Sequence, residues 1–324
     1  MKAAVYHENG GPEVLRYEEV PDPALHPKGV IIRVEAISIE GGDTLNRWRG
    51  PLVKNPHIVG YQAAGEIIEI GEAVPESFGL KVGDKVATVD GYGSHASLRP
   101  VPARNCWKIP DGLDPAKAAV VPVAIGTAHE CLFGRGQLKA GEKVLVQAGA
   151  GGVGLAAIQL AKRAGASMVI ATASSEERLE QLKAYGLDHG INYTTQDVAK
   201  TVKELTEGKG VDVIVDPVGG ATLQGSLDSL GYRGRVSLVG QAGRESNKID
   251  VAKMMGMNQT LSGVFLGAEI MQDRIHDMIQ QLVDDVAAGE IEVVIDKRFP
   301  LSEAAEAHRY IESRKAVGRV VMIP

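Results

Sequence analysis

The 324-residue chain has few cysteines, few aromatic residues and no long apolar run. Its two cysteines, Cys106 and Cys131, cannot build a disulfide scaffold or supply a four-cysteine zinc site. No stretch approaches the ~20 uninterrupted apolar residues of a membrane helix, and residues 1–8 lack the apolar segment of a secretory signal. These absences predict a cytoplasmic protein with no membrane segment.

An excess of basic residues is also missing. Lys and Arg number 35 against 41 for Asp and Glu, which gives a net charge of −6. Nucleic acids and anionic membranes attract basic surfaces, so the acidic balance argues against general binding to either. The hydrophobic share of 44% and the charged share of 23% are typical of a soluble globular protein, and the length favours two domains.

Glycine, in contrast, is abundant, with 39 residues that indicate many tight turns and close backbone approaches. Before residue 120, short β-like runs at 29–36, 65–71 and 85–89 are separated by turn residues. Such closely spaced strands predict a small barrel or curved sheet.

After residue 120 the pattern changes to strands that alternate with helices. The alternation predicts a parallel sheet with right-handed crossovers. The expected strands are 143–147, 168–172, 211–216 and 235–240, and the expected helices include 154–164 and 176–185. The tail, residues 319–324, is β-like again, and we expect it to return to the first domain.

The most informative segment fits the pattern G-x-G-x-x-G through Gly149, Gly151 and Gly154. It follows an expected strand and opens an expected helix, which is the context that this motif requires. Gly149 would permit the tight turn, Gly151 would let the backbone approach a pyrophosphate, and Gly154 would let the helix pack closely on the strand. Backbone N–H groups of the helix N-terminus would then face the phosphates. This context favours a dinucleotide site over a ligand-free turn.

The residues after the second strand of this domain favour NADPH over NADH. NAD sites usually place a carboxylate there to bind the ribose 2′-hydroxyl, but this chain has Ser174 and Ser175, with Arg178 one turn into the next helix. Hydroxyls and a guanidinium can bind a 2′-phosphate, which a carboxylate would repel. The alternative for Arg178 is a solvated residue paired with Glu177.

Several motifs together resemble a known family. They are the opening residues 1–5 with 9–15, the Gly60-x-x-Ala63-Ala64-Gly65 segment, residues 83–86, and Gly151-Gly152-Val153-Gly154. Over essentially its whole length the chain resembles the medium-chain dehydrogenase/reductase superfamily, in its zinc-independent quinone oxidoreductase branch. The resemblance implies an α/β fold with a Rossmann-type doubly wound parallel sheet and a GroES-like β-barrel domain, in agreement with the pattern of the elements.

The resemblance also implies a domain plan and an assembly. Residues 1–122 would form the GroES-like catalytic domain, 123–290 the Rossmann dinucleotide-binding domain, and 291–324 would return to the GroES-like domain. The cofactor would lie in the cleft between the domains, and the protein would be a homodimer.

The family comparison indicates that no metal is bound. Zinc-dependent members carry cysteine where this chain has Glu40, and a Gly-His-Glu motif where it has Gly60-Tyr61-Gln62. A catalytic zinc usually needs three protein ligands, and Glu40 lacks partners. We therefore expect direct hydride transfer from NADPH to an electron-poor acceptor, with the protein aligning the two reactants.

The resemblance assigns cofactor contacts residue by residue. Gly151, Gly152 and Val153 would touch the pyrophosphate, while Ser174, Arg178 and Arg314 would meet the 2′-phosphate. Tyr193 would lie near the adenosine, Thr127 near the phosphates or the nicotinamide, and Gly240, Gln241 and Phe265 beside the nicotinamide. The alternatives are an ordinary surface charge for Arg314 and an ordinary half-buried tyrosine for Tyr193.

Two residues are candidates for chemistry at the acceptor. Glu40 would be a carboxylate that handles protons, since burial can raise the pKa of a carboxyl group; a structural hydrogen-bonding role is the favoured alternative. Tyr61 would lend its hydroxyl to the substrate, or it would serve packing.

Three functions remain open on the sequence alone. The first is an NADPH-dependent quinone reductase. The second is a reductase of activated C=C bonds in α,β-unsaturated carbonyl substrates, as in enoyl or haloacrylate reductases of the same superfamily. The third is a non-catalytic NADPH-binding protein.

Overall fold

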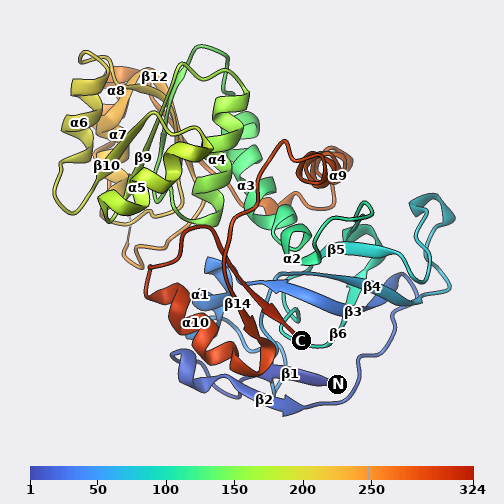
Figure 1. The fold of residues 1–324 in the computed structure, drawn as a ribbon. Coiled ribbons are helices and arrows are strands. Elements are labelled where there is room, and N and C mark those ends of the chain that lie inside the picture. The colour runs from blue at the N-terminus through green and yellow to red at the C-terminus, as the bar shows by residue number, and fades with distance from the viewer. Residues whose placement is uncertain (247) are drawn as a thin grey trace. The chain divides into compact units, whose positions relative to one another are not determined.

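The computed structural model describes residues 1–246 and 248–324, which form two compact units. The first unit comprises Met1–Gly126 and Gly267–Pro324, and the second comprises Thr127–Leu266. Figure 1 shows the elements of each unit, with the C-terminal segment among the strands of the N-terminal one.

The first unit contains most of the strands. They are β1 (Lys2–Val5), β2 (Arg16–Glu19), β3 (Gly29–Ser38), β4 (Gln62–Ile70), β5 (Lys85–Val89), β6 (Leu98–Pro102), β7 (Cys106–Lys108), β14 (Ile295–Pro300) and β15 (Arg319–Ile323). Its helices are α1 (Gly41–Arg49), α2 (Pro115–Ala118), α9 (Asp273–Ala287) and α10 (Ala304–Glu312).

A seven-stranded sheet organises this unit, in the order β14-β15-β3-β4-β5-β7, with β6 also paired to β3. The C-terminal strand β15 runs antiparallel to β3, so that Val321 lies opposite Ser38. The core of this unit is mainly aliphatic and includes Ile32, Ile67 and Met322. Because β15 lies between β14 and β3, its first residue, Arg319, contacts Glu40 at the start of α1.

The second unit alternates strands and helices. Its strands are β8 (Lys143–Val146), β9 (Met168–Ala173), β10 (His189–Asn192), β11 (Val211–Asp216), β12 (Leu230–Leu238) and β13 (Thr260–Gly263). Its helices are α4 (Gly152–Arg163), α5 (Glu176–Leu182), α6 (Val198–Leu205), α7 (Thr222–Ser229) and α8 (Val251–Met257), and the short α3 (Gly126–His129) begins at the unit boundary.

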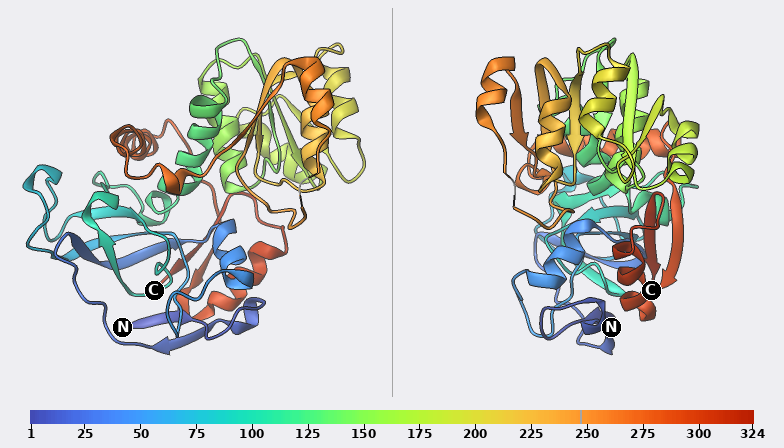
Figure 2. Two further views of the ribbon diagram at one scale, coloured as in Figure 1. Left: turned by 180° about the vertical axis from the view of Figure 1, so that it is seen from behind. Right: turned by 90° about the vertical axis from the view of Figure 1, so that its left-hand side faces the viewer.

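All six strands of this unit are parallel, in the order β10-β9-β8-β11-β12-β13. Numbered from β8, this is the order 3-2-1-4-5-6 of a doubly wound dinucleotide-binding sheet. Helices cover both faces, with α5 on one side and α7 and α8 on the other (Figure 2). The strand order reverses between β8 and β11, which is where such sheets bind ligands.

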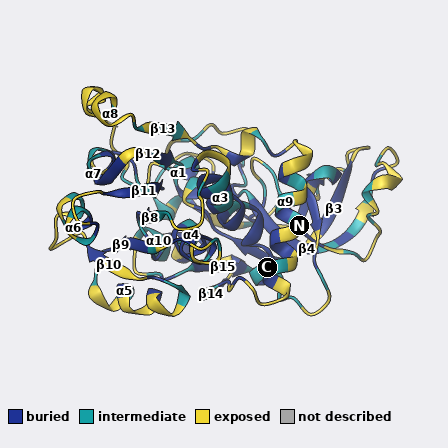
Figure 3. Cartoon of the chain, turned by 90° about the horizontal axis from the view of Figure 1, so that it is seen from above, coloured by how far each residue is buried: buried dark blue, intermediate teal, exposed yellow. Residues whose placement is uncertain are grey.

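Local sequence signals explain where the helices of this sheet begin and end. Ser175 caps α5, because its hydroxyl accepts the N–H of Arg178, and Gly186 follows the helix in the left-handed conformation. Asp197 and Asp250 cap α6 and α8 in the same way. Figure 3 shows the result, with buried strands and exposed outer residues on α5, α6 and α8.

The boundaries of the two compact units differ from the domain boundaries expected from the sequence. The expected Rossmann domain included residues 267–290, yet Gly267 and the residues after it, with helix α9, belong to the first unit. Long-range hydrogen bonds explain this grouping. Trp107 Nε1 donates to the His276 carbonyl at 3.0 Å, and Lys108 N donates to Gln280 Oε1 at 3.0 Å.

One helical segment, Pro115–Arg135, is long and apolar enough by length and composition to cross a membrane. However, 78% of its apolar window is buried inside the protein. Core helices of soluble proteins are mostly buried in the same way, so length and composition alone are weak evidence for a membrane span. The two cysteines are also buried, and burial raises the pKa of the Cys106 thiol to about 12 and raises that of Cys131. Neither thiol is a reactive nucleophile.

Candidate functional site

The glycine-rich turn connects β8 to α4 in the second unit. Gly151 is the N-cap of α4, and Gly151 N donates to the Ala148 carbonyl at 2.9 Å. The left-handed residue of the turn is Ala148, with φ 51°. The first N–H groups of a helix lack acceptors within it, so the start of α4 offers donors to an anion.

The three glycines of the turn have different surroundings. A Cβ on Gly149 would lie 2.7 Å from the Ala171 Cβ, and a Cβ on Gly154 would collide with the Ala148 carbonyl. A Cβ on Gly151 would meet only the Ala148 carbonyl oxygen, at 3.4 Å. Packing therefore requires the first and third glycines. Gly151 instead leaves open space beside the helix N-terminus, and this space fits a dinucleotide pyrophosphate.

The predicted 2′-phosphate residues Ser174 and Arg178 lie together. Arg178 Nη1 donates to Ser174 Oγ at 3.0 Å, and both side chains are partly exposed. Tyr193 follows β10, and its backbone N donates to the Ala173 carbonyl at 3.1 Å. A guanidinium, a hydroxyl and a phenol thus lie at the carboxyl-terminal ends of β9 and β10. This set of groups suits a phosphate ester.

The other expected cofactor residues lie at different places. Gly240 and Gln241 follow β12, and Phe265 follows β13 with 75% of its surface exposed. Because the strands are parallel, these residues are at the same sheet edge as the glycine-rich turn. Thr127 is buried at the start of the second unit. Arg314 belongs to the first unit, after α10, with φ 57°.

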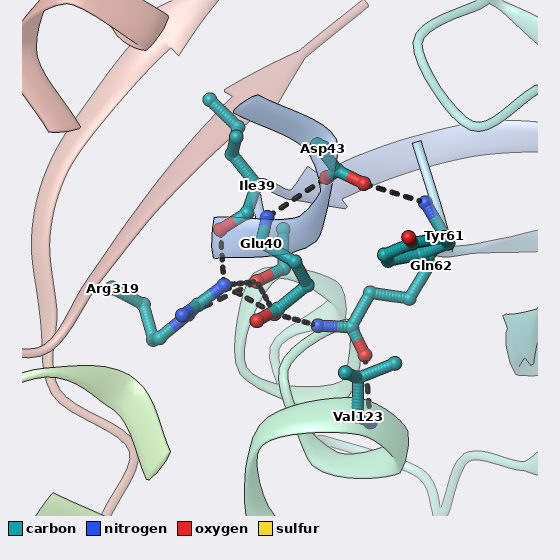
Figure 4. A network of polar contacts seen from close by, with 8 residues as sticks. Ile39, Glu40, Asp43, Tyr61, Gln62, Val123 and Arg319 are labelled. Carbon is teal, nitrogen blue, oxygen red and sulfur yellow. Dashed lines mark hydrogen bonds and ion pairs between the residues drawn. The ribbon is translucent and has the colours of Figure 1, made fainter. Parts of the chain in front are cut away.

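Glu40, the first catalytic candidate, is held in a buried polar network in the first unit (Figure 4). Its Oε1 accepts from Arg319 Nη2 and from Gln62 Nε2, and Ser38 Oγ donates to it at 3.4 Å. Burial raises the pKa of Glu40, while Arg319 opposes the shift. These contacts agree with the structural role rather than with a carboxyl group that exchanges protons.

Asp43, in the first turn of α1, joins Glu40 to Tyr61. Its Oδ2 accepts from Glu40 N at 2.8 Å, and its Oδ1 accepts from Tyr61 N at 3.2 Å (Figure 4). Burial raises the pKa of Asp43 to about 7, although both N–H donors oppose that shift. Asp43 therefore fixes the backbone on either side of the candidate site.

Tyr61, the second catalytic candidate, precedes β4. Its hydroxyl oxygen accepts a hydrogen bond from Asn46 Nδ2 at 2.8 Å. Burial raises the pKa of the Tyr61 phenol. The phenol is therefore neutral at physiological pH and keeps its own proton, so it can serve as a donor.

Arg319 and Asp43 are part of this network, but sequence reasoning missed both. Arg319 opens the otherwise apolar strand β15, and a charged residue at a buried position indicates a partner elsewhere in the chain. That signal was readable in the sequence. The identity of the partner, Glu40, was not.

The network does not fit a zinc ion. The Glu40 carboxylate faces the Arg319 guanidinium and the Gln62 amide N–H, so cationic or N–H donors occupy the place of a metal. Among residues 1–246 and 248–324 there is no group of three or more His, Cys, Asp or Glu residues that could hold a metal ion.

Comparison with known proteins agrees with both units. A family model described as "Alcohol dehydrogenase GroES-like domain" matches residues 26–111, and one described as "Zinc-binding dehydrogenase" matches residues 152–284. The chain is 36% identical to a 2-haloacrylate reductase from Burkholderia sp. over 337 aligned positions, covering 100% of this chain and 99% of that protein. It is 32% identical to a quinone oxidoreductase from Pseudomonas aeruginosa, covering 97% of each.

A solved structure of a mycobacterial protein complexed with NADPH is also similar. It superposes with a TM-score of 0.94 at 32% identity, over 100% of both chains. The fold and the site define an α/β protein with a dinucleotide-binding sheet and a GroES-like domain. The chain belongs to the medium-chain dehydrogenase/reductase superfamily, in its quinone oxidoreductase branch.

Proposed function

We propose that this protein is an NADPH-dependent, zinc-independent reductase of quinones or α,β-unsaturated carbonyl compounds. The observation that carries the proposal is the edge of the parallel sheet, where the open glycine-rich turn lies beside the Ser174–Arg178 pair. The bound cofactor would supply the hydride. The chain would bind its phosphates, exclude water and orient the acceptor.

The names of the relatives support this class of acceptor. One relative is a quinone oxidoreductase and another is a 2-haloacrylate reductase, and both names describe reduction of an electron-poor π-system. Steady-state NADPH oxidation with small quinones and with α,β-unsaturated carbonyls tests the proposal directly. Turnover with either set supports it, and the ratio of kcat/KM values identifies the preferred class. Tight NADPH binding without turnover would favour the non-catalytic alternative.

Cofactor preference provides a sharper test. Arg178→Ala is expected to raise the KM for NADPH about tenfold while leaving that for NADH unchanged, because only NADPH carries the 2′-phosphate that the guanidinium would contact. Arg163→Ala, at the far end of α4, is the matched control for loss of a charge. An equal effect on both cofactors, or none, would contradict the proposed phosphate site.

We also propose that the protein is a cytoplasmic homodimer that pairs through the second unit. Strand β13 is the last strand of the six-stranded sheet, so one of its edges has no strand partner within the described residues. The neighbouring helix α8 exposes Val251 (66%) and Met255 (78%), which is unusual for large apolar side chains. A second copy would cover both features.

The double variant Val251→Asp/Met255→Asp is expected to shift the mass in multi-angle light scattering from dimer towards monomer. The carboxylates would have to be buried without partners in the interface. Val82→Asp, at a residue 62% exposed in the first unit, is the control and should leave the mass unchanged. A wild-type monomer at micromolar concentration would rule out the dimer.

A further inference from the structure

We infer that Asp43, Asn46 and Arg99 are positioning residues that hold the Tyr61 hydroxyl as the hydrogen-bond donor to the oxygen of the acceptor. The inference rests on the proposed reductase function, and it extends that function to residues that neither the motifs nor the relatives assign. It also narrows the substrate class. The acceptor should carry a carbonyl oxygen that becomes negatively charged when hydride is added to the conjugated system.

Three contacts fix Tyr61 at three separate points. Its backbone N–H donates to Asp43 Oδ1 at 3.2 Å, its carbonyl accepts from Arg99 Nη2 at 2.6 Å, and its phenol oxygen accepts from Asn46 Nδ2 at 2.8 Å. Asp43 and Asn46 lie three residues apart on α1, and Arg99 comes from β6. The backbone and the tip of the side chain are therefore both restrained, a degree of control that simple packing of a tyrosine does not require.

Two glycines make room for this arrangement. A Cβ on Gly42 would collide with the Tyr61 ring, so the ring lies directly against the first turn of α1. Gly60, which precedes Tyr61, has φ 114° and faces Ser94 and His95. A residue with a side chain would be strained at that φ. Gly42 thus lets the ring lie against α1, and Gly60 allows the backbone conformation that leads into Tyr61.

Arg99 is costly to bury, which is a second reason to assign it a role. Its exposed fraction is 0%, and its contacts within the described part of the chain include no carboxylate. It donates instead to Thr88 and to three backbone carbonyls, those of Tyr61, Asp90 and Tyr92. Burial lowers the pKa of Arg99 to about 10. Burying an arginine without a hydrogen-bonded carboxylate destabilises a fold. The hydrogen bonds of Arg99 tie Tyr61 to the 90–92 loop.

The direction of the Asn46 bond leaves the Tyr61 proton available. Since Asn46 Nδ2 donates to the phenol oxygen, the phenol O–H points elsewhere, and no acceptor for it is found among residues 1–246 and 248–324. A fixed donor without an internal acceptor is suited to a developing oxyanion. Hydride addition places two electrons and a hydrogen on the acceptor, one proton then comes from water, and NADP⁺ is left. Tyr61 donates a hydrogen bond throughout and keeps its proton.

The test compares Tyr61→Phe, Asn46→Leu and the double variant. Tyr61→Phe is expected to lower kcat about 100-fold and Asn46→Leu about tenfold, with the dissociation constant for NADPH unchanged in both. The double variant should be no slower than Tyr61→Phe alone, because Asn46 acts only through the phenol. Additive losses would show that Asn46 acts independently, and an unchanged kcat in Tyr61→Phe would overturn the inference while the reductase function stands.

Arg99→Lys tests the backbone side of the arrangement, with Arg33→Lys on the exposed face of β3 as the matched control. We expect Arg99→Lys to lower kcat and Arg33→Lys to leave kcat unchanged. In ¹³C-tyrosine NMR, the Tyr61 ring signal, assigned by its loss in Tyr61→Phe, should shift or broaden in Arg99→Lys and Asn46→Leu. An unmoved signal would refute the positioning role. Failure of the wild type to reduce any acceptor would instead refute the proposed function and the donor role of Tyr61 with it.

Discussion

Gly151→Ala is expected to weaken NADPH binding at least tenfold, or about 1.4 kcal/mol, with little change in thermal stability. A methyl group on Gly151 would meet only one protein atom, the Ala148 carbonyl oxygen at 3.4 Å, so the folded protein has room for it. It would fill the space beside the helix N-terminus where a pyrophosphate would lie. Isothermal titration with NADPH and a thermal melt of the free protein measure the two effects separately.

Gly154→Ala is the matched control, because it lies in the same turn and has the opposite expectation. Its Cβ would collide with the Ala148 carbonyl and lie 2.8 Å from the Gly149 Cα. Both are backbone atoms, which move only if the turn deforms, so this variant should melt at a lower temperature. If Gly151→Ala lost stability as Gly154→Ala does, or bound NADPH normally, the turn would not be a phosphate site.

The difference between these two glycines marks what the sequence can predict. The glycine spacing, the strand before it and the helix after it are local, so the turn and the parallel sheet follow from a few dozen consecutive residues. The Ser174–Arg178 contact is local too, since one helical turn joins the residues. The left-handed conformation of Ala148 was not predicted, because nothing in the pattern distinguishes it from Gly149 as the turning residue.

The acceptor side of the protein could not be predicted in the same way. Arg319 and Glu40 are 279 residues apart, and they meet only because β15 pairs with β3. The position of helix α9 depends on contacts of Trp107 and Lys108 that lie about 170 residues away in sequence. A single sequence identifies a buried charge but contains no signal for its partner, so the Arg319–Glu40 contact could not be predicted.

A buried series of hydrogen bonds in the first unit leads to the second prediction, which concerns the stability of the protein. Arg47 Nη1 lies 2.6 Å from His308 Nδ1, His308 Nε2 lies 2.9 Å from His95 Nε2, and His95 Nδ1 lies 3.1 Å from Ser94 Oγ. Arginine can only donate, so His308 Nδ1 must accept. His308 then donates through Nε2 to His95, and His95 donates through Nδ1 to Ser94. Both histidines are therefore neutral, each in one tautomer.

His308→Ala is expected to lower the free energy of unfolding by about 3 kcal/mol. The substitution opens a cavity and removes the acceptor of the fully buried Arg47, which keeps its ion pair with Glu312 at 2.7 Å. His308→Asn should recover part of the loss, because its amide oxygen can accept near the position of Nδ1. Urea denaturation of the three proteins at pH 8 measures the differences, and equal losses in both variants would contradict the acceptor role.

The two histidines of this hydrogen-bonded series should lower the free energy of unfolding as the pH falls. Burial lowers the pKa of His95 to about 3 and lowers that of His308 well below its usual value. A histidine with a depressed folded-state pKa contributes stability that is present above its unfolded pKa, about 6.5, and lost as the pH falls. Each group costs about 1.4 kcal/mol per pH unit below that value. Asp43 and Glu40 change the stability in the opposite direction. Burial raises the pKa of Asp43 to about 7 and also raises that of Glu40, so the folded protein binds these protons before the unfolded chain does.

The measurement must therefore compare slopes rather than absolute stabilities. Between about pH 6 and pH 5, these two carboxyl groups oppose the histidine contribution in the wild type, and they oppose it equally in His308→Asn. The variant lacks one titrating histidine, so its free energy of unfolding should fall less steeply, by about 1.4 kcal/mol per pH unit. The cost of His308→Asn would then shrink as the solution is acidified. Parallel pH curves for the two proteins would show that His308 is already protonated in the folded state, and the single-direction hydrogen-bond chain would be wrong.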